Sequence, residues 1–184
     1  MNHCTVEIMS SDYKVKLLLC GPAAVGKTSL IRRFVKSSFE ADYKLTIGVD
    51  ILTKDVTLSD TNEVATLSIW DVGGQKRFEF IRTTFYKGAS GALLVFDLTR
   101  PETYTEVTEK WYNEILRYCP NIPTVLIGNK ADLLEKLGRT TDPQYAEKWA
   151  NNANTKYIET SALEGQNVET AFYEITERMV SKLR

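Results

Sequence analysis

The sequence predicts an α/β fold, a three-layer sandwich in which about five helices cover a mostly parallel six-stranded sheet. Short apolar segments alternate with segments of helical periodicity along the 184 residues, as in a parallel sheet with crossover helices. Only one pair of neighbouring strands is joined by a short polar turn, so we expect a single antiparallel edge strand. A glycine-rich turn stands directly between the first strand and the first helix.

The expected strands are marked by their apolar residues. Residues 13–20 begin with alternation and become continuously apolar, as a strand buried on both faces does. Residues 47–59 and 64–70 are two strands joined by the polar turn 59–63. The remaining strands are short segments bounded by polar residues, at 91–98, 124–128 and 156–160.

Four segments have a helical pattern, at 27–36, 102–118, 142–151 and 168–183. In the longest of them one face carries the apolar and aromatic residues Tyr104, Val107, Trp111, Ile115 and Tyr118. Residues 39–46 are polar and irregular. Residues 72–82 are charged and interrupted by glycines, so we expect that segment to be mobile.

Length and charge limit the classes of function. The chain fits one domain, which we place at 13–184, after an N-terminal extension, 1–12, that we expect to be flexible. With 23 basic and 24 acidic residues the net charge is −1, which argues against nucleic-acid binding through a basic face. The sequence has no apolar stretch long enough to span a bilayer and no signal-peptide pattern at its start.

The cysteines and the two ends of the sequence indicate a reducing compartment and no lipid anchor. Cys4, Cys20 and Cys119 lack the spacing of metal ligands, which fits reduced thiols in the cytoplasm. Asn2 stands where myristoylation requires glycine, and the last residues include no cysteine for prenylation. We therefore expect a cytoplasmic location, with peripheral attachment to membranes only through partners or a tail missing from this sequence.

The strongest local signal is the segment 21–28, GPAAVGKT, which has the GxxxxGKT pattern of a phosphate-binding loop. Its two glycines permit backbone angles that other residues resist, so that successive N–H groups can point at phosphate oxygens, and the following helix adds its dipole. The alternative is an ordinary glycine turn before a helix. We expect the nucleotide phosphates to be held by this loop and the first helical turn, through Ala24, Val25, Gly26, Lys27, Thr28 and Ser29.

Three further residues complete a site for phosphate and metal. Lys27 supplies a positive charge at the β- and γ-phosphates, and Thr28 offers a hydroxyl to Mg²⁺. Asp71 follows a strand close to the expected metal and can hold a metal-bound water. Thr46 can bring its hydroxyl to Mg²⁺ and its N–H to the γ-phosphate, contacts that exist only in the triphosphate state.

The segment 70–75, WDVGGQ, can act on the γ-phosphate. Gly74 offers a backbone N–H to that phosphate, and the amide of Gln75 can orient an attacking water. Alone, an aspartate and two glycines after a strand form a plain turn more often than a site. Their combination with the phosphate-binding loop favours the functional interpretation.

Two loops that follow later strands select the base. The segment 129–132, NKAD, places the carboxylate of Asp132 against the N1–H and 2-amino donors of guanine, which adenine lacks. Asn129 can brace neighbouring loops and contact N7, and the Lys130 stem can lie along the purine face. In the segment 161–163, SAL, the Ala162 N–H can donate to guanine O6 while Ser161 and Leu163 complete the loop. In isolation the first segment is compatible with a solvated polar loop, and the second with a plain strand end.

With all five motifs in order, the chain resembles the Ras superfamily of small GTPases over essentially its full length, which implies a P-loop NTPase fold. It is most similar to Rab proteins in the segments 46–50 (TIGVD), 69–71 (IWD), 75–78 (QKRF) and 159–163 (ETSAL). The segment 72–75 (VGGQ) is instead similar to Arf proteins and heterotrimeric Gα subunits.

The resemblance implies further contacts and partners. Phe39 would meet the guanine ring edge-on and Tyr43 would lean over the phosphates, unless both pack on the body of the domain. The aromatic trio that contacts effectors in Rab proteins corresponds to Ile51, Trp70 and Phe85, so one member is aliphatic here. The loops 38–48 and 71–86 would change with the nucleotide and recruit effectors of a monomeric switch in vesicle traffic. Exchange factors and GTPase-activating proteins are also expected.

The leading hypothesis is a slow GTPase in which Gln75, Lys27 and Thr46 are catalytic. Arg77 and Arg82 are only weak candidates for an internal arginine finger, so turnover without an activating protein is expected to be slow. The alternative is a nucleotide-locked interaction module that binds without cycling, against which Gln75 and Thr46 argue. A small ATPase or nucleotide kinase would share only the phosphate-binding loop.

Overall fold

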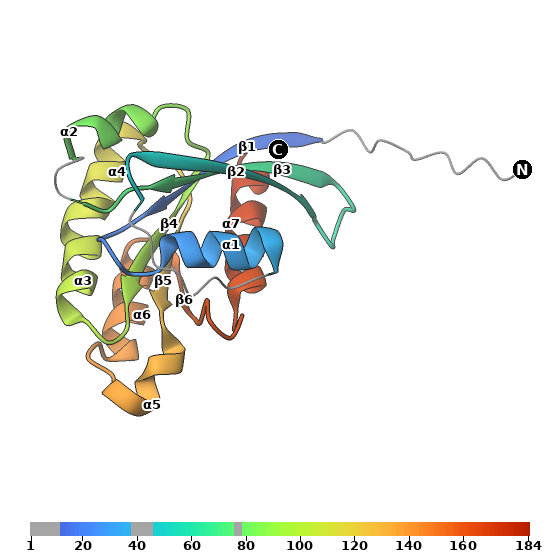
Figure 1. Ribbon diagram of the computed structural model, residues 1–184. Coiled ribbons are helices and arrows are strands. Elements are labelled where there is room, and N and C mark those ends of the chain that lie inside the picture. The colour runs from blue at the N-terminus through green and yellow to red at the C-terminus, as the bar shows by residue number, and fades with distance from the viewer. Residues whose placement is uncertain (1–11, 38–45, 76–78) are drawn as a thin grey trace, which may run out of the picture.

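A computed structural model describes residues 12–37, 46–75 and 79–184 of the chain. Its centre is a six-stranded sheet with the strand order β2-β3-β1-β4-β5-β6 (Figure 1). The bounds are Tyr13–Cys20 for β1, Val49–Thr57 for β2, Val64–Val72 for β3, Gly91–Asp97 for β4, Thr124–Asn129 for β5 and Lys156–Thr160 for β6. All described pairs in this sheet are parallel except β2–β3, which confirms the expected single antiparallel edge strand.

Helices cover both faces of the sheet, which gives the three layers predicted from the sequence (Figure 1). α1 (Lys27–Lys36) and α7 (Val168–Ser181) lie on one face. The other face carries α2 (Glu79–Arg82), α3 (Pro101–Glu106), α4 (Tyr112–Tyr118) and α6 (Pro143–Asn152), while the short α5 (Leu134–Leu137) follows β5. A π-helical turn, Val107–Trp111, joins α3 to α4, so the expected helix 102–118 is a single rod with a local widening.

Each face of the sheet has its own apolar core. On the α1 and α7 side, Phe34 stacks on Phe172 with ring centroids 4.0 Å apart. On the opposite side Trp111 is fully buried against the sheet residues, together with Val107 and Ile115 from the predicted helical face. Tyr118, the last residue of that predicted face, is 48% exposed because the helix ends there.

Several element boundaries differ from the sequence prediction. β2 is shorter at both ends than the expected strand 47–59, and at its start Gly48 has a φ of +79°, which does not continue a strand. The segment 72–82, expected to be mobile, was assigned no regular structure, but residues 79–82 form the short helix α2, and Arg82 is buried. α5 was not predicted, since four residues are too few to show a helical period.

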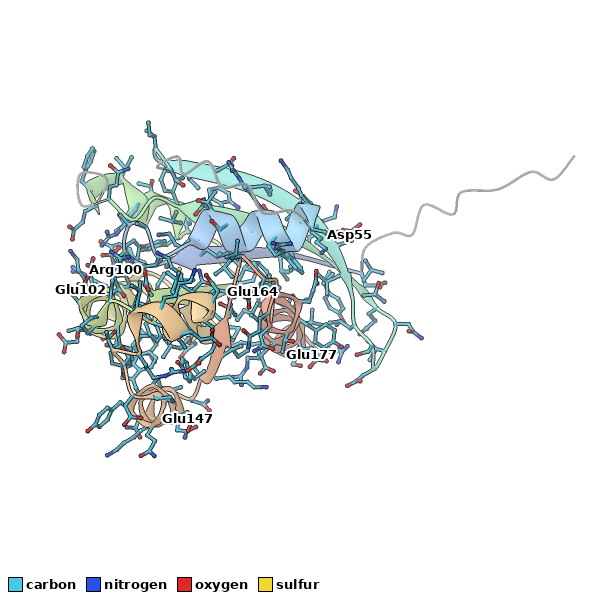
Figure 2. The ribbon with its side chains drawn as sticks, turned by 60° about the horizontal axis from the view of Figure 1, so that its bottom comes forward. Asp55, Arg100, Glu102, Glu147, Glu164 and Glu177 are labelled. Carbon is cyan, nitrogen blue, oxygen red and sulfur yellow. The ribbon has the colours of Figure 1, made fainter. Side chains whose placement is uncertain are left out.

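Charged side chains cover the outside of the molecule, including the exposed Asp55, Glu102 and Glu147 (Figure 2). Cys20 and Cys119 are buried free thiols, whereas Cys4 lies outside the described residues. Among the described helices, none combines the length and the apolar character needed to cross a bilayer.

Candidate functional site

The predicted site residues meet at one edge of the sheet. β1, β3, β4, β5 and β6 run parallel, so their carboxyl ends and the loops that follow them lie together. The phosphate-binding loop follows β1, the glycine pair follows β3, and the two base loops follow β5 and β6. The alternation of strands and helices in the sequence therefore predicts correctly that these loops lie together at one edge of the sheet.

Glycine is required at both ends of the phosphate-binding loop. Gly21 has a φ of +147°, and a Cβ atom there would lie 2.1 Å from the carbonyl oxygen of Val95 in β4. Gly26 has a φ of +95°, and its Cβ would lie 2.3 Å from Nδ2 of Asn129 in the first base loop. The loop is thus pressed against two neighbouring strand ends at distances that a side chain would not permit.

Lys27 lies inside this loop and is 6% exposed. Its Nζ donates to the carbonyl oxygens of Gly21 at 2.7 Å and Pro22 at 2.8 Å, which holds the ammonium against the backbone that would surround the phosphates. Burial lowers the pKa of Lys27 to about 8, although the nearby Asp71 carboxylate opposes this. A buried cation whose hydrogen bonds go to neutral carbonyl oxygens is a favourable place for an anionic ligand.

Three oxygen-bearing side chains converge beside Lys27. The Thr28 Oγ1 and Thr46 Oγ1 atoms are 2.9 Å apart, and Thr46 Oγ1 lies 3.1 Å from Oδ2 of Asp71. Thr28 also donates to this carboxylate oxygen. The other oxygen, Asp71 Oδ1, is buried and has no hydrogen-bond partner among the described residues.

This cluster fits a magnesium site. Hydroxyl and carboxylate oxygens are the ligands that Mg²⁺ prefers, and Mg²⁺ keeps several of its waters. The unpartnered buried Oδ1 is the acceptor that such a water needs. Burial raises the pKa of Asp71, and hydrogen bonds from Thr28 and the charge of Lys27 counteract that rise. A cation in the cluster would favour the ionised carboxylate further.

The glycine pair after β3 lies directly against the phosphate-binding loop. A Cβ on Gly74 would lie 2.5 Å from the carbonyl carbon of Pro22 and 2.6 Å from the nitrogen of Ala23. Gly73 donates its N–H to the carbonyl of Gly48 at 2.9 Å, which joins this segment to the one that contains Thr46. Nε2 of Gln75 is buried without a partner among the described residues, so a donor is available next to the loop.

A cavity of about 240 Å³ opens between the phosphate-binding loop and the two base loops. It is lined by Ala24, Gly26, Ser29, Asn129, Lys130, Asp132, Leu133, Ala162 and Leu163. All except Leu133 are residues that the sequence analysis assigned to the nucleotide. The signal that could have found Leu133 is its apolar side chain directly after the NKAD segment.

Asn129 joins the three loops around this cavity. Its Nδ2 donates to the Val25 carbonyl at 2.9 Å, and its Oδ1 accepts from Thr160 Oγ1 at 3.0 Å and from the Ala162 N–H at 3.3 Å. The expected bracing role of Asn129 is therefore present in the structure. The Ala162 N–H, which was expected to donate to a guanine oxygen, donates in this structure to Asn129 Oδ1 at 3.3 Å.

The Asp132 carboxylate is held by the neighbouring loop. Its Oδ1 accepts from Ser161 Oγ at 2.5 Å, so Ser161 joins the two base loops. Arg33 of α1 was not singled out in the sequence. Its Nε donates to the Ala162 carbonyl at 2.9 Å, which fixes the second loop to α1.

The structure describes only one of four further residues that the sequence predicts at or near the nucleotide. Phe39, Tyr43 and Arg77 lie outside the described residues. Arg82 is not available as an arginine finger, because its guanidinium is buried and donates to both carboxylate oxygens of Glu114, with its Nε 2.7 Å from Oε1. A buried ion pair of this kind fixes the side chain away from any phosphate.

The three residues expected to contact effectors lie together in a second cluster. Ile51 and Trp70 are directly paired across β2 and β3, and the rings of Trp70 and Phe85 have centroids 6.3 Å apart. Nζ of Lys16 lies 3.5 Å from the centroid of the Trp70 ring. Ile51 is 49% exposed, so these residues form a half-buried apolar patch on the edge of the sheet.

Comparison with known proteins agrees with this geometry. Residues 16–181 match the sequence model of the Ras family. The chain is 45% identical over 175 residues to the Ras-related protein YPT3 of Nicotiana plumbaginifolia, covering 93% of this chain and 78% of that protein. It is 41% identical over 165 residues to the Ras-related proteins RABA1c of Arabidopsis thaliana and Rab11B of Nicotiana tabacum, covering 89% of this chain and 74% of each relative.

Proposed function

Because the chain belongs to the Ras family and is a small GTPase most similar to Rab proteins, we propose that it is a magnesium-dependent switch using the site described above. The family membership makes the protein a GTP- and GDP-binding hydrolase. In this switch some residues bind the nucleotide, some act in hydrolysis, and two segments respond to the presence of the γ-phosphate. We also assign residues 13–184 to the GTPase domain and 1–12 to an extension.

The observation that carries this proposal is the cavity between the phosphate-binding loop and the two base loops. A purine nucleotide has phosphates at one end and a base at the other, and the cavity connects residues suited to each end. In this arrangement Asp132 accepts from the two guanine donors, and Lys130 and Leu133 flank the purine. The backbone of residues 24–29 and the Lys27 ammonium bind the phosphates.

Thr28, Thr46 and Asp71 are the residues that would hold Mg²⁺, the two hydroxyls directly and the carboxylate through water. When bound, the ion supplies neutralisation of the charge on the β- and γ-phosphates. Thr46 is connected through the Gly48–Gly73 hydrogen bond to the glycine pair. The segments 38–48 and 71–86 would therefore respond together to the γ-phosphate.

Hydrolysis in this proposal depends on positioning. Gln75 orients a water in line with the γ-phosphate, Lys27 stabilises the charge that develops on the transferred group, and the Gly74 N–H binds one of its oxygens. Arg82 offers no finger at this place, since it is committed to Glu114. We expect single-turnover hydrolysis on the order of 10⁻⁴ to 10⁻² per second without a partner.

The half-buried patch of Ile51, Trp70 and Phe85 supports recognition by effector proteins. Similarity to Rab-named relatives extends the proposal to regulation of vesicle traffic in the cytoplasm and at membranes, with exchange and activating proteins as further partners. Since one position of the trio is aliphatic, effectors that require three aromatic residues are not expected to bind.

The first test is the identity of the nucleotide that co-purifies with the protein. Chromatography of the denatured sample is expected to release GDP or GTP in about one-to-one ratio, and wild-type protein that binds neither in the presence of Mg²⁺ would refute the proposal. Asp132→Asn is expected to shift preference from guanine to xanthine nucleotides, because the amide offers the N–H donor that the 2-oxo group of xanthine accepts.

A second test separates turnover from simple binding. Gln75→Leu keeps the size of the side chain and removes the amide, so we expect bound GTP to persist at least tenfold longer than in the wild type. Equal rates of GTP loss in the two proteins would instead favour a nucleotide-locked interaction module.

A further inference from the structure

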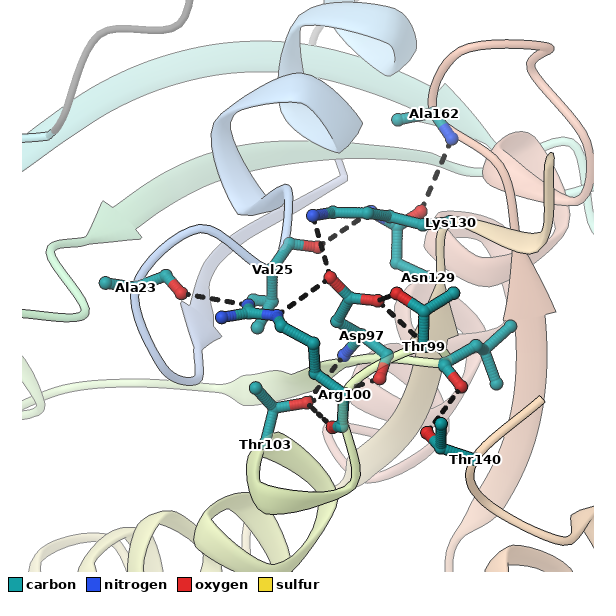
Figure 3. Close-up of polar contacts among 11 residues, drawn as sticks. Ala23, Val25, Asp97, Thr99, Arg100, Thr103, Asn129, Lys130, Thr140 and Ala162 are labelled. Carbon is teal, nitrogen blue, oxygen red and sulfur yellow. Dashed lines mark hydrogen bonds and ion pairs between the residues drawn. The ribbon is translucent and has the colours of Figure 1, made fainter. Parts of the chain in front are cut away.

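Asp97 occupies a central position that the proposed mechanism does not use. It is the last residue of β4 and pairs in the sheet with Asn129, so it stands between the phosphate-binding loop and the first base loop. Its side chain is 2% exposed. One carboxylate oxygen, Oδ1, accepts from the Thr99 N–H at 2.9 Å and from Thr99 Oγ1 at 2.7 Å (Figure 3).

The other carboxylate oxygen binds two cations from different loops. Oδ2 lies 2.7 Å from Nζ of Lys130 in the first base loop and 3.1 Å from Nε of Arg100 (Figure 3). The four donors saturate the acceptor capacity of the carboxylate. Burial alone would raise the pKa of Asp97, but hydrogen bonds from Lys130 and Thr99 outweigh it and lower that pKa, so the group is ionised at neutral pH.

Arg100 makes a second contact that reaches the phosphate-binding loop. Its terminal nitrogen donates to the carbonyl oxygen of Ala23 at 3.2 Å, while its Nε stays on Asp97 (Figure 3). The backbone of Arg100 is fixed as well, since its N–H donates to the Asp97 carbonyl at 3.0 Å and Thr103 Oγ1 donates to its carbonyl at 2.6 Å. The guanidinium therefore bridges a rigid turn after β4 and the loop after β1.

The cluster has an excess of positive charge. Two cations, Arg100 and Lys130, share the single negative charge of Asp97, which leaves one net positive charge among these three groups. They lie at the boundary between the place for the phosphates and the place for the base. The excess positive charge attracts a polyanionic ligand, and without such a ligand the repulsion between the two cations is not fully offset.

We propose that Arg100 is a positioning residue that, through Asp97, ties the phosphate-binding loop to the first base loop and thereby slows the release of bound GDP. The inference rests on the function proposed above. A bound nucleotide contacts both loops, so its departure requires them to move relative to each other. The Ala23–Arg100–Asp97–Lys130 chain of contacts resists that movement without touching the reacting atoms.

The test measures release of a fluorescent GDP analogue from the magnesium-bound protein in the presence of excess unlabelled GDP. Arg100→Met keeps the apolar stem of the side chain and removes all of its donors. We expect it to release the analogue about 3- to 10-fold faster than the wild type, the range for losing partly exposed charge-assisted hydrogen bonds. Arg100→Lys keeps a cationic donor and is expected to give a rate between those two.

Arg178→Met is the matched control. Arg178 also pairs with one acid, Glu174, at 2.7 Å, and its side chain is 34% exposed against 36% for Arg100, but it lies on α7 away from the nucleotide loops. We expect this variant to release the analogue at the wild-type rate. Acceleration of the same size in Arg178→Met would overturn the inference, since it would then reflect general loosening of the fold.

Two other outcomes decide the matter. Release from Arg100→Met at the wild-type rate would overturn the inference, because the polar bridge would then have no effect on the nucleotide. Release from Arg100→Lys as fast as from Arg100→Met would also overturn it, because restoring a donor should restore part of the bridge. Both outcomes require that the wild type binds GDP, so they are distinct from a failure of the proposed function, in which the wild type binds no guanine nucleotide.

Discussion

Removal of the carboxylate at Glu114 is expected to destabilise the protein severely, because this group is the partner of a buried arginine. The side chain of Arg82 is 2% exposed and that of Glu114 is 14% exposed. Nε of Arg82 donates to Oε1 at 2.7 Å, the Tyr86 hydroxyl donates to the same oxygen at 2.8 Å, and the guanidinium lies 4.0 Å from the Trp111 ring centroid. Glu114→Ala leaves this guanidinium and the Tyr86 hydroxyl without their acceptor.

The expected cost follows from leaving a buried guanidinium without its hydrogen-bonded carboxylate, since the remaining ion-pair partner among the described residues, the partly exposed Glu79, lies 3.7 Å away. Breaking a buried ion pair by removing one partner costs about 3–5 kcal/mol, and the lower end applies here because Glu114 retains some solvent contact. For a domain of this size a loss of about 3 kcal/mol lowers the melting temperature by roughly 6–12 °C. Arg82→Met removes the charge and keeps the contact with Trp111. The double variant Arg82→Met/Glu114→Ala should therefore be more stable than Glu114→Ala alone.

The assay is urea unfolding at a fixed, saturating concentration of GDP and Mg²⁺, since bound ligand adds to the measured stability. Glu109→Ala, which removes an exposed acid from the same helical rod, is the control and is expected to change the free energy of unfolding by less than about 0.5 kcal/mol. A cost below about 1 kcal/mol for Glu114→Ala, or a double variant less stable than that single variant, would refute the reasoning.

Three further perturbations have defined outcomes. Gly26→Ala places a Cβ 2.3 Å from Nδ2 of Asn129 at a φ of +95°, so GDP binding measured by titration calorimetry should be lost; retained affinity would contradict the packing argument. Chelation of Mg²⁺ should speed GDP release in stopped-flow fluorescence, and an unchanged rate would remove the metal from the site. Burial would raise the pKa of Glu159, but hydrogen bonds from Arg139 and Tyr157 outweigh it and lower that pKa. Its ionised form therefore adds stability above the unfolded pKa of about 4.3, and the stability difference between wild type and Glu159→Gln should shrink as the pH falls from about 5 to 3.

The sequence by itself determined the fold class and most of the residues that the structure brings together in the proposed nucleotide site. Apolar residues follow different patterns in buried strands and in amphipathic helices, so the alternation of the two elements can be recognised in the sequence. Each motif follows a strand, and the carboxyl ends of parallel strands meet at one edge, so Gly26, Asp71, Asn129 and Ala162 could be assembled into one site without coordinates. The conformation of the phosphate-binding loop could also be predicted at its two glycines, because the backbone angles of Gly21 and Gly26 permit almost no other residue.

Only the tertiary structure showed which charged residues are buried and which partners they have. Arg82 was a weak candidate for an arginine finger from the sequence, but it is buried and paired with Glu114, 32 positions further along the chain. Arg100 carried no local signal, and it gained its place by reaching Ala23, 77 positions away. The periodicity of apolar residues shows which face of a helix or strand packs on the core. Whether a charged side chain can be buried depends instead on a partner that the fold brings from a distant part of the chain. No local sequence pattern therefore predicts the burial of Arg82 or the contacts of Arg100.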